Sequence, residues 1–515
     1  MMMLDFLLAS SVLFSTISFG STLASQIKDW QGNPKLFMNS GPMKTDAHGY
    51  PVPDADFRDL DASALNQRSE LRRKVRDRII FRGRGNQKAA ADMSTNNPED
   101  FLQSGLKFTN IFALDKPELK SSRSSILPWS GDYWGTYKGG IAARFSDPSF
   151  EESSSWSENY NYIKQHPAAD LIRLDSPEEL VKLSPAEKYD LISDSGGKLA
   201  SYAWGEGEAY LRNVGEVETW FGICHGWAPA SYIEARPSAA IDVPVAGLKS
   251  PVKFLPSDIK ALASQMWAKS QFTSRFIGGR CEERDVKIDE ATGRIIEKDC
   301  FDINPMSWHL SIIHELGIEK RAFVVDASED YQVWNQPVFE YKMSYFNPLT
   351  ALPSDDLAAS LIDYALWQND PYKAWRNPLV KKVVGVAMDI SYRTETSPSS
   401  ALIDTEEQDN SYTTRYIYDL ELDDKGEIIG GEWYQRRHPD FIWTAALGAR
   451  PVGYGDRNLE SVSWNPLTET FPVVWKDNAA RAADAGQIPD RVLESLIRAS
   501  ATKVDPPTPP VPPVL

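Results

Sequence analysis

Strand-like segments in the second half of the chain constrain its fold more than any other feature. Val384–Tyr392 alternates in part between apolar and polar residues. Tyr416–Leu422 and Ile428–Tyr434 are separated by the turn residues 423–426 (DDKG). Two strand-like runs joined by a short polar turn that contains glycine are typical of a β-hairpin. We therefore expect a substantial antiparallel sheet.

Two helix starts carry the capping-box pattern. In each, a serine is followed by proline and then by a glutamate three positions after the serine: Ser176 with Glu179, and Ser184 with Glu187. The serine hydroxyl can accept a free backbone N–H of the first turn, and the glutamate can reach back to the N–H of the serine. Helices beside an antiparallel sheet predict the α+β class, and we find no internal repeat.

The one strongly apolar run lies near the N-terminus, at residues 6–19 (FLLASSVLFSTISF). It is shorter than the roughly 20 residues that span a bilayer. Because small residues follow it, we predict a signal peptide at residues 1–24; the alternative is an N-terminal core helix. No later segment is long and apolar enough to cross a membrane, so we expect a secreted, extracellular protein with no membrane span.

Composition divides the rest of the chain. Residues 25–125 are polar and rich in Asn, Asp, Ser and Arg, which is typical of an extension or a pro-segment. We expect the main folded domain at residues 126–500 and a Pro-rich disordered tail at 501–515, which ends in PPTPPVPPVL. The 515 residues allow a sizeable core, and a net charge of −17 argues against a nucleic-acid partner.

Three cysteines exclude a disulfide-dense scaffold. Cys281 and Cys300 flank a strand–turn–strand pattern whose hairpin would bring them close enough to form a disulfide. Cys224 is then the free thiol. It lies in WFGICHGWAPAS, where Gly222 and Gly226 permit close approach of the backbone to a substrate and where the following residues can begin a helix. The positive end of a helix dipole favours a thiolate, so Cys224 is a candidate nucleophile; the alternative is a buried, inert cysteine.

His309 and Asp326 are the candidate partners of this thiol. His309 lies in the apolar segment Trp308–Leu316, and Arg321–Asp326 has the pattern of the next strand. A hairpin of the two segments would place the imidazole beside the carboxylate, which could orient and charge the ring. The alternative is that His309 is a structural histidine.

Two other histidines are weaker candidates. In a regular strand, His314 would point to the face opposite His309. His225 follows Cys224 directly, and adjacent side chains on a helix diverge by about 100°.

Motifs for metal and nucleotide sites are missing from the sequence. We find no HExxH, no Cys/His ligand spacing, no twelve-residue calcium loop and no Gly-rich phosphate loop. An acidic run contains Asp419, Glu421, Asp423 and Asp424, which we interpret as a solvated hairpin edge.

Several segments between residues 128 and 445 resemble one known family, the transglutaminase elicitors of oomycetes and their bacterial relatives. These segments are LSPAEKYDL (183–191), GICHGWAPAS around Cys224, the Cys281–Cys300 hairpin followed by NPMSWH, VWNQPV (333–338), and IIGGEWY with HPDF (428–441). The hexapeptide Val333, Trp334, Asn335, Gln336, Pro337 and Val338 is similar to the start of the surface peptide by which plants perceive the oomycete enzymes. Phe339 and Glu340 then replace a basic-glycine pair.

The resemblance implies a papain-like, transglutaminase-type cysteine acyltransferase core. Cys224 matches the family's nucleophile, His309 its histidine and Asp326 its aspartate. The implied activity is that of a protein-glutamine γ-glutamyltransferase, which forms isopeptide cross-links between glutamine and lysine side chains of protein substrates through a Cys224 thioester. Trp220 and Trp227 could wall off water from such a site.

The resemblance further implies calcium as an activator, without indicating its ligands, and no organic cofactor. It also implies that a host receptor recognises VWNQPV. Two alternatives stay open. A cysteine peptidase or amidase would use the same three residues, because water can intercept a thioester. A non-enzymatic surface or cell-wall binding protein would be in keeping with 16 tryptophans and an acidic, secreted chain.

Overall fold

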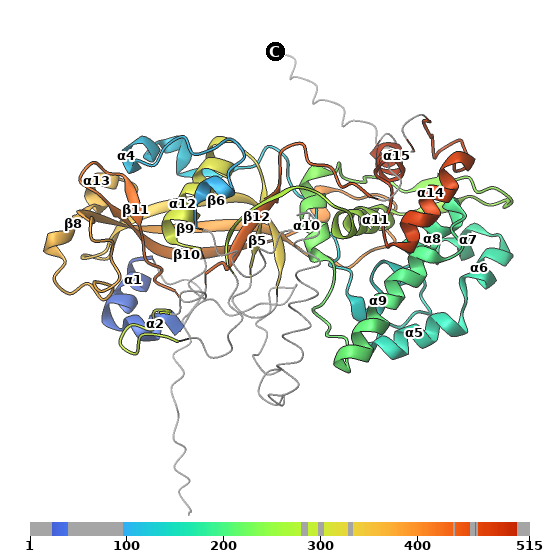
Figure 1. Ribbon diagram of the computed structural model, residues 1–515, viewed down its shortest axis with the longest axis horizontal. Helices are drawn as coiled ribbons and strands as arrows, with labels where there is room; N and C mark the ends of the chain where they lie inside the picture. The colour runs from blue at the N-terminus through green and yellow to red at the C-terminus, as the bar shows by residue number, and fades with distance from the viewer. Residues whose placement is uncertain are drawn as a thin grey trace, which may run out of the picture.

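The computed structural model describes residues 23–39, 96–279, 287–296, 303–327, 333–435, 438–453, 459 and 462–501. Within these ranges, most of the longer helices lie at one end of the molecule and a large sheet lies at the other, with α10 (Cys224–Ile233) between them (Figure 1). The structure therefore has the predicted α+β architecture.

A ten-stranded antiparallel sheet forms the middle of one end of the molecule. Seven of its strands follow the order β11-β10-β9-β6-β5-β12-β4. Their bounds are β4 Ser274–Gly278, β5 Phe323–Asp326, β6 Asn335–Asn347, β9 Lys382–Thr394, β10 Asn410–Leu422, β11 Ile428–Gly430 and β12 Phe441–Ala445. The short strands β1 (Ser121–Arg123), β7 (Leu352–Ser354) and β8 (Ile362–Asp363) pair along its margins. A separate hairpin consists of β2 (Ile241–Val243) and β3 (Val252–Phe254).

The predicted hairpin between β10 and β11 is confirmed. Glu421 pairs with Gly430, and Gly426 takes the left-handed backbone conformation, with φ of 86°, that lets the turn close. The regular strand stops at Gly430, so the second arm is shorter than the Ile428–Tyr434 predicted.

The two faces of the sheet are covered by different helices. Phe323 and Val325 pack in the same core as α12 (Pro305–Ile312), whereas Val324 packs against Ala228 and Tyr232 of α10 (Cys224–Ile233). Successive residues of a strand point to opposite faces. Helices α10 and α12 therefore lie on opposite faces of β5.

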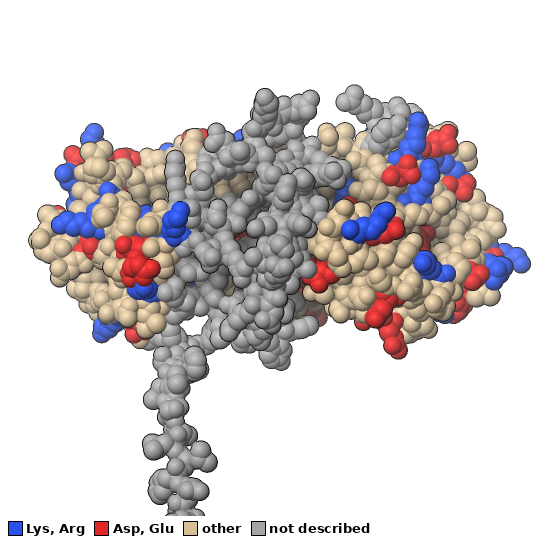
Figure 2. Space-filling model, turned by 60° about the horizontal axis from the view of Figure 1, so that its bottom comes forward, with Lys and Arg blue, Asp and Glu red and all other residues tan. Residues whose placement is uncertain are grey.

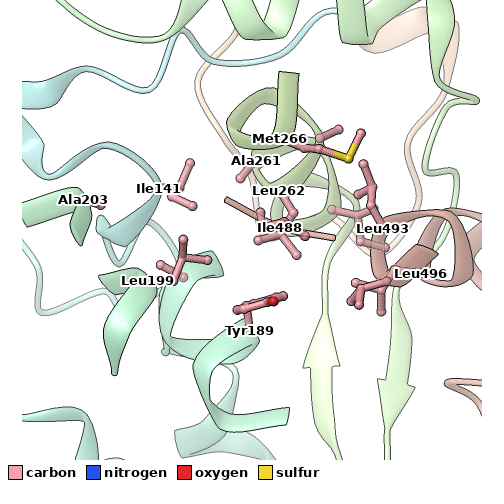
Figure 3. Close-up of a cluster of buried hydrophobic side chains, with 14 of the residues drawn as sticks. Ile141, Tyr189, Leu199, Ala203, Ala261, Leu262, Met266, Ile488, Leu493 and Leu496 are labelled. Atoms are coloured by element: carbon pink, nitrogen blue, oxygen red, sulfur yellow. The ribbon is translucent and has the colours of Figure 1, made fainter. Parts of the chain in front are cut away.

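The helical end has its own core, which Figure 3 shows in close-up. Leu199, Leu262 and Leu496 meet there, from three helices far apart in the chain. The helices of this end are α5 (Trp156–Gln165), α6 (Ala168–Leu174), α7 (Pro177–Leu180), α8 (Pro185–Ser193), α9 (Lys198–Val214), α11 (Pro256–Lys269), α14 (Val473–Asp484) and α15 (Asp490–Ala501). The predicted capping box at Ser184 is confirmed in full, and Ser176 accepts the backbone N–H of Glu179 as predicted.

Two parts of the predicted polar extension pack against the body of the protein. In α1 (Leu23–Gly32), which α2 (Pro34–Asn39) follows, Trp30 stacks on Tyr434 with ring centroids 3.9 Å apart. Phe101 and Ile111 are fully buried in the sheet core. Residues 96–125 are thus part of the folded unit, and residues 40–95 lie outside the described ranges. Cleavage of the extension stays a prediction, as do the signal peptide and the tail, since residues 1–22 and 502–515 are also outside these ranges.

The strand predicted around His309 is wrong. The segment is helix α12, followed by a π-helical turn at Ile313–Ile318. Asn304 caps the helix by accepting the backbone N–H of Met306, and Pro305 occupies the first turn. His309 and Asp326 therefore do not lie across a hairpin from each other.

The interpretation of the acidic run as a solvated edge is wrong for two of its residues. Asp419 is fully buried and Glu421 almost so, because both bind the buried guanidinium of Arg376. Asp423 lies in the turn, where it accepts backbone N–H groups of Lys425 and Glu427.

On the face drawn in Figure 2, basic and acidic side chains are interspersed over the described surface at both ends of the molecule. Among the described residues, no helix is long and apolar enough to cross a membrane.

Candidate active site

Cys224 is the first residue of α10, as the sequence predicts for a helix start. Its side chain is buried and unpaired with any other cysteine. The flanking glycines serve the packing of the protein itself. A Cβ at Gly222 would lie 2.5 Å from the Tyr133 carbonyl oxygen, and one at Gly226 would lie 2.1 Å from that of Ser264. Both glycines therefore allow close packing of the protein's own backbone, and an approach to a substrate stays a prediction.

Asn335 is the principal hydrogen-bond partner of the thiol. Its Nδ2 donates to the Cys224 sulfur at 3.5 Å, and the sulfur lies 3.6 Å from the Val333 carbonyl oxygen. Trp443 Nε1 donates to Asn335 Oδ1 at 2.8 Å. Because an indole can only donate, this contact fixes the amide with its NH₂ group towards the sulfur.

Asp326 lies beside this pair. It is the last residue of β5 and pairs directly with Asn335, the first residue of β6. Directly opposed side chains of an antiparallel pair share one face of the sheet. Asp326 is fully buried, and its Oδ1 accepts the backbone N–H of Trp334 at 3.0 Å. The strand pair therefore holds a carboxylate next to the Cys224–Asn335 contact.

The electrostatics around the thiol favour its neutral form. Burial raises the pKa of Cys224 to about 11, the hydrogen bonds of Asn335 act in the opposite direction, and the charges of Glu395 and Asp326 raise it further. In this conformation Cys224 is a protonated thiol at neutral pH.

The structure does not bring His309 to Cys224. His309 is fully buried on α12, and its Nδ1 lies 2.9 Å from the Tyr418 hydroxyl oxygen in β10. Cys224, by contrast, begins α10 on the opposite face of the sheet. A paired sheet thus separates the imidazole from the thiol.

The two sites are also far apart along the strands. Tyr418 pairs with Val386 and Val386 with Tyr345, which lies ten residues along β6 from Asn335. At roughly 3.3 Å per residue this is about 30 Å along the strand. The predicted convergence of Cys224 with His309 is therefore wrong, whereas Asp326 and Cys224 do come together.

Other described histidines are engaged elsewhere. His314 Nδ1 contacts the Leu310 carbonyl, and His438 stacks on Trp433. Burial lowers the pKa of His225 to about 3, so that ring is neutral. Among the described residues, the hydrogen-bond partners of the thiol are Asn335 and Val333, and neither is a histidine. His48 lies outside the described ranges.

Comparison with known proteins places the chain in a family. The family model described as "Transglutaminase elicitor" matches residues 96–452, a range that contains Cys224, Asn335 and Asp326. The chain belongs to the transglutaminase elicitor family. The crystal structure of the GP42 transglutaminase from Phytophthora sojae is similar, with 20% sequence identity, a TM-score of 0.48 and coverage of 80% of this chain and 100% of that one. No curated protein matches the chain.

The elicitor-like hexapeptide Val333–Val338 is part of the site itself. Val333 and Asn335 contact the thiol, and Trp334 binds Asp326. Gln336 binds Glu395. The residues from Asn335 to Val338 are buried, and only Val333 and Trp334 are half-buried. Most of this segment is therefore inside the folded elicitor-family protein.

Trp220 and Trp227, which are predicted to exclude water from the site, differ in burial. Trp227 is fully buried in α10, and its Nε1 donates to the Trp129 carbonyl oxygen at 3.2 Å, so it is a core residue. Trp220 is half-buried and packs edge-on against Phe221, with centroids 6.0 Å apart. That either ring excludes water from a reaction stays a prediction.

The predicted disulfide lies outside the described ranges, since Cys281 and Cys300 both fall in gaps. The tip of the predicted hairpin is described: Ile288 bridges Ile295, and Gly293 turns the chain with φ of 76°. As for calcium, the described residues include no group of three or more His, Cys, Asp or Glu side chains that could hold a metal ion. We therefore assign no residues to calcium.

Sequence reasoning missed three members of the site: Asn335 as the thiol's partner, Trp443, which orients it, and Glu395. One signal could have found Asn335. It opens the strand that follows Asp326, and consecutive antiparallel strands place the end of one opposite the start of the next. Trp443 and Glu395 carry no comparable signal, because they reach the site through tertiary packing.

Proposed function

We propose that this protein is a secreted protein-glutamine γ-glutamyltransferase that acts through a Cys224 thioester. One observation carries the proposal: in a chain of the transglutaminase elicitor family, a free thiol at a helix start accepts a hydrogen bond from Asn335, whose cross-strand partner is the carboxylate of Asp326. Thiol acyl transfer needs a nucleophilic sulfur and a group that can take its proton, and Cys224 and Asp326 are the residues that we propose for these roles.

The first half of the reaction acylates the enzyme. As the sulfur attacks the carbonyl carbon of a glutamine carboxamide, the thiol proton passes to Asp326. The Asn335 N–H stabilises the developing thiolate, and the backbone N–H of Cys224, in a helix turn that offers it no intrahelical acceptor, can bind the oxyanion. The C–N bond then breaks, ammonia leaves with the proton from Asp326, and a γ-glutamyl thioester remains.

The second half transfers the acyl group. A neutral lysine amine attacks the thioester, the C–S bond breaks, and the amine proton returns to the sulfur through Asp326. Asp326 thus takes the acid–base role that sequence reasoning gave to His309, because carboxylates can act as general acids and bases where their surroundings permit.

The remaining parts of the proposal rest on the sequence. Secretion is supported by the apolar run at residues 6–19 and by family membership. Protein substrates with accessible glutamine and lysine are the proposed partners. Calcium activation stays a prediction from the family resemblance. Recognition of folded VWNQPV by a host receptor would have to rely on Val333 and Trp334.

The test uses the full-length protein, a glutamine-containing acceptor protein and a biotinylated primary amine, after treatment with a chelator and with or without added calcium. We expect incorporation of biotin, and we expect Cys224→Ala to abolish it. A control substitution of an exposed residue, such as Glu340→Gln, should leave it unchanged. Cleavage of the acceptor protein without incorporation would instead identify a cysteine peptidase.

A non-enzymatic binding protein is the second candidate. It is favoured by the raised pKa of the buried thiol and by the separation of His309 from it. This candidate predicts that a glutamine substrate neither acylates Cys224 nor changes its rate of alkylation, whereas the transferase predicts that the substrate acylates Cys224 and thereby blocks its alkylation.

A further inference from the structure

A polar cavity lies between α11 and the loop that follows β9. Its volume is about 200 Å³. Its lining includes Asp132, Trp134, Ser257, Lys260, Ser397 and Asp404. A single water needs roughly 10–15 Å³ of such space, so the cavity has room for a small organic molecule. Among the described residues that line it, neither Cys224 nor a hydrogen-bond partner of the thiol is present, so the cavity is a site of its own.

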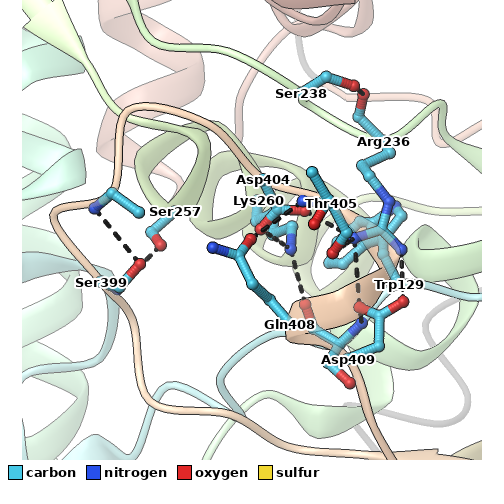
Figure 4. A network of polar contacts seen from close by, with 12 residues as sticks. Trp129, Arg236, Ser238, Ser257, Lys260, Ser399, Asp404, Thr405, Gln408 and Asp409 are labelled. Carbon is cyan, nitrogen blue, oxygen red and sulfur yellow. Dashed lines mark hydrogen bonds and ion pairs between the residues drawn. The ribbon is translucent and has the colours of Figure 1, made fainter. Parts of the chain in front are cut away.

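Hydrogen bonds between distant segments hold the walls of the cavity in place. The loop after β9 is tied to α11, because the backbone N–H of Ser399 donates to Ser257 Oγ at 3.0 Å (Figure 4). The same loop is tied to the segment before β2, because the backbone N–H of Thr396 donates to the Gly131 carbonyl oxygen at 2.8 Å. A pocket whose walls are already fixed is typical of small-molecule sites, since binding then orders little of the chain.

The charged side chains of the lining are balanced by ion pairs. Lys260 Nζ donates to Asp404 Oδ2 at 2.6 Å and to the Ser130 carbonyl oxygen at 2.8 Å (Figure 4). Asp132 Oδ2 lies 3.1 Å from Lys138 Nζ. A bound cation would meet the ammonium of Lys260, and a bound anion would meet the carboxylates of Asp132 and Asp404, and contacts between like charges are unfavourable. The charge balance of the lining therefore favours a neutral ligand.

The lining offers hydrogen-bond donors and acceptors together. An ammonium has three donors, and hydrogen bonds within the described chain use two of those of Lys260. The carboxylates of Asp132 and Asp404 only accept, and each of their oxygens can take more than one hydrogen bond. Ser257 and Ser397 add hydroxyl groups. A ligand with several hydroxyl groups can pair with all of these side chains, because each hydroxyl both donates and accepts.

Trp134 is a strained residue of the lining. Its φ of 51° lies in the left-handed region, which is costly for a bulky side chain, and such strain concentrates at active sites and ligand sites. The ring is buried, and its Nε1 has no hydrogen-bond partner among the described residues. A buried donor without an acceptor destabilises the protein, and a ligand oxygen that accepts from Nε1 would remove this cost. Strain and the missing acceptor both indicate that a ligand completes the cavity.

We propose that this cavity binds a single neutral sugar ring of the hexose type. Such a ring carries hydroxyl groups around its edge and no charge, which matches the mixed donors and acceptors and the charge balance of the lining. The exposed residues Ser397, Ser399 and Gln408 open the cavity to the surface, so the ring can be a free sugar or the terminal unit of a glycan. This inference is independent of the acyl transfer proposed above, because it involves no residue of the candidate active site.

The test measures binding to the full-length protein. The probes are D-glucose, D-galactose, D-mannose and N-acetyl-D-glucosamine, each as the free sugar and as the end of a β-linked disaccharide, followed by saturation-transfer NMR. Inorganic phosphate is the anionic probe, followed by the broadening of its ³¹P signal. We expect saturable binding of at least one of the sugars and none of phosphate. Tighter binding of the disaccharide identifies a glycan as the ligand, and equal binding of the two forms identifies the free sugar.

A matched pair of variants in one loop locates the binding. Ser397→Trp puts a large side chain at an exposed position of the lining and should raise the Kd for the sugar by about tenfold or more. Ser400→Trp makes the same change at an exposed residue that is not part of the lining and should leave the Kd within about twofold. Trp134→Phe, which removes the indole N–H, should raise the Kd by about tenfold. If Trp134→Phe does not fold, the pair of exposed variants decides.

Cys224→Ala separates this site from the acyl transfer, since it should bind the sugar as the unmodified protein does. Acyl transfer that fails in the unmodified protein while the sugar still binds would overturn the proposed function and leave the sugar site in place. The sugar site itself would be overturned by the absence of saturable binding for every sugar, by binding of phosphate instead, or by equal binding in Ser397→Trp and the unmodified protein.

Discussion

Asn335 lies directly opposite Asp326 at the ends of β6 and β5, and its side-chain amide donates to the sulfur of Cys224. One residue therefore joins the thiol to the carboxylate, on the face of the sheet that α10 covers. This arrangement takes the place of the Cys224–His309–Asp326 triad that the sequence predicts.

Asn335→Ala should lower kcat/KM by about tenfold to a hundredfold, because a hydrogen bond to a charged group contributes about 1.5–3 kcal/mol. Trp443→Phe keeps an aromatic ring and removes only the indole donor that orients the amide. It should cause a smaller loss in the same assay. A greater loss in Trp443→Phe than in Asn335→Ala would contradict the proposal that Trp443 acts only by orienting the Asn335 amide.

Asp326→Asn should act in opposite directions on turnover and on alkylation. Loss of the proton acceptor should lower kcat by about a hundredfold or more, with a small change in KM. The negative charge of Asp326 raises the pKa of Cys224, so its removal should lower that pKa and speed iodoacetamide labelling at a fixed pH near 8. Slower labelling together with normal turnover would remove Asp326 from the mechanism.

His309→Gln should leave acyl transfer within about twofold of the unmodified protein, since this ring lies on the far side of the sheet. The change alters the contact with Tyr418 and should lower the free energy of unfolding by about 1 kcal/mol. Tyr418→Phe, which removes the other partner, should destabilise the protein by a similar amount. Loss of turnover in His309→Gln with normal thermal stability would restore His309 to the active site.

Alkylation of Cys224 in the absence of substrate should depend steeply on pH. An ordinary thiol ionises near pH 8.5, whereas the pKa of Cys224 is raised to about 11. A raised pKa favours the neutral thiol, so the labelling rate should rise about tenfold per pH unit from pH 7 to beyond pH 9. Peptide mapping at each pH isolates Cys224 from the other two cysteines. A plateau below pH 8 would mean that the thiolate is stabilised in the free protein.

Arg376→Met should destabilise the protein by about 3–5 kcal/mol, because the variant leaves buried carboxylates without their cation. Arg376 binds Asp370, Asp419 and Glu421, and all four side chains are buried. Arg415→Met breaks a half-exposed pair with Asp389 on the same sheet and should cost about 1 kcal/mol or less. Denaturant unfolding of both variants measures their free energies of unfolding. Equal losses would contradict the claim that the buried ion pairs of Arg376 matter more to stability than the half-exposed pair of Arg415.

Local patterns predicted much of the fold. The alternation of Val384–Tyr392, the turn at residues 423–426 and the serine at the start of α8 each describe a few neighbouring residues, and the structure confirms the elements they predict. The strand predicted around His309 is wrong for a physical reason. A short apolar run that is buried on all sides suits a strand and a helix equally, and only the cap formed by Asn304 and Pro305 distinguishes them.

The site depends on relations that no local pattern contains. The helix start at Cys224 and the strand that ends at Asp326 were both predicted. Which face of the sheet α12 covers, however, is decided by packing between segments far apart in the chain. The same packing brings Trp443 to Asn335 across 108 residues. The sequence therefore predicted two members of the site and misplaced the third.

The most direct test of the account is the mass of the acylated protein. The unmodified protein and His309→Gln are incubated with a glutamine peptide, quenched in acid and mapped by mass spectrometry. We expect an adduct of the peptide minus ammonia on the Cys224 peptide in both proteins, and none in Cys224→Ala. An adduct that forms in the unmodified protein and is lost in His309→Gln, or no adduct on Cys224 at all, would contradict the account.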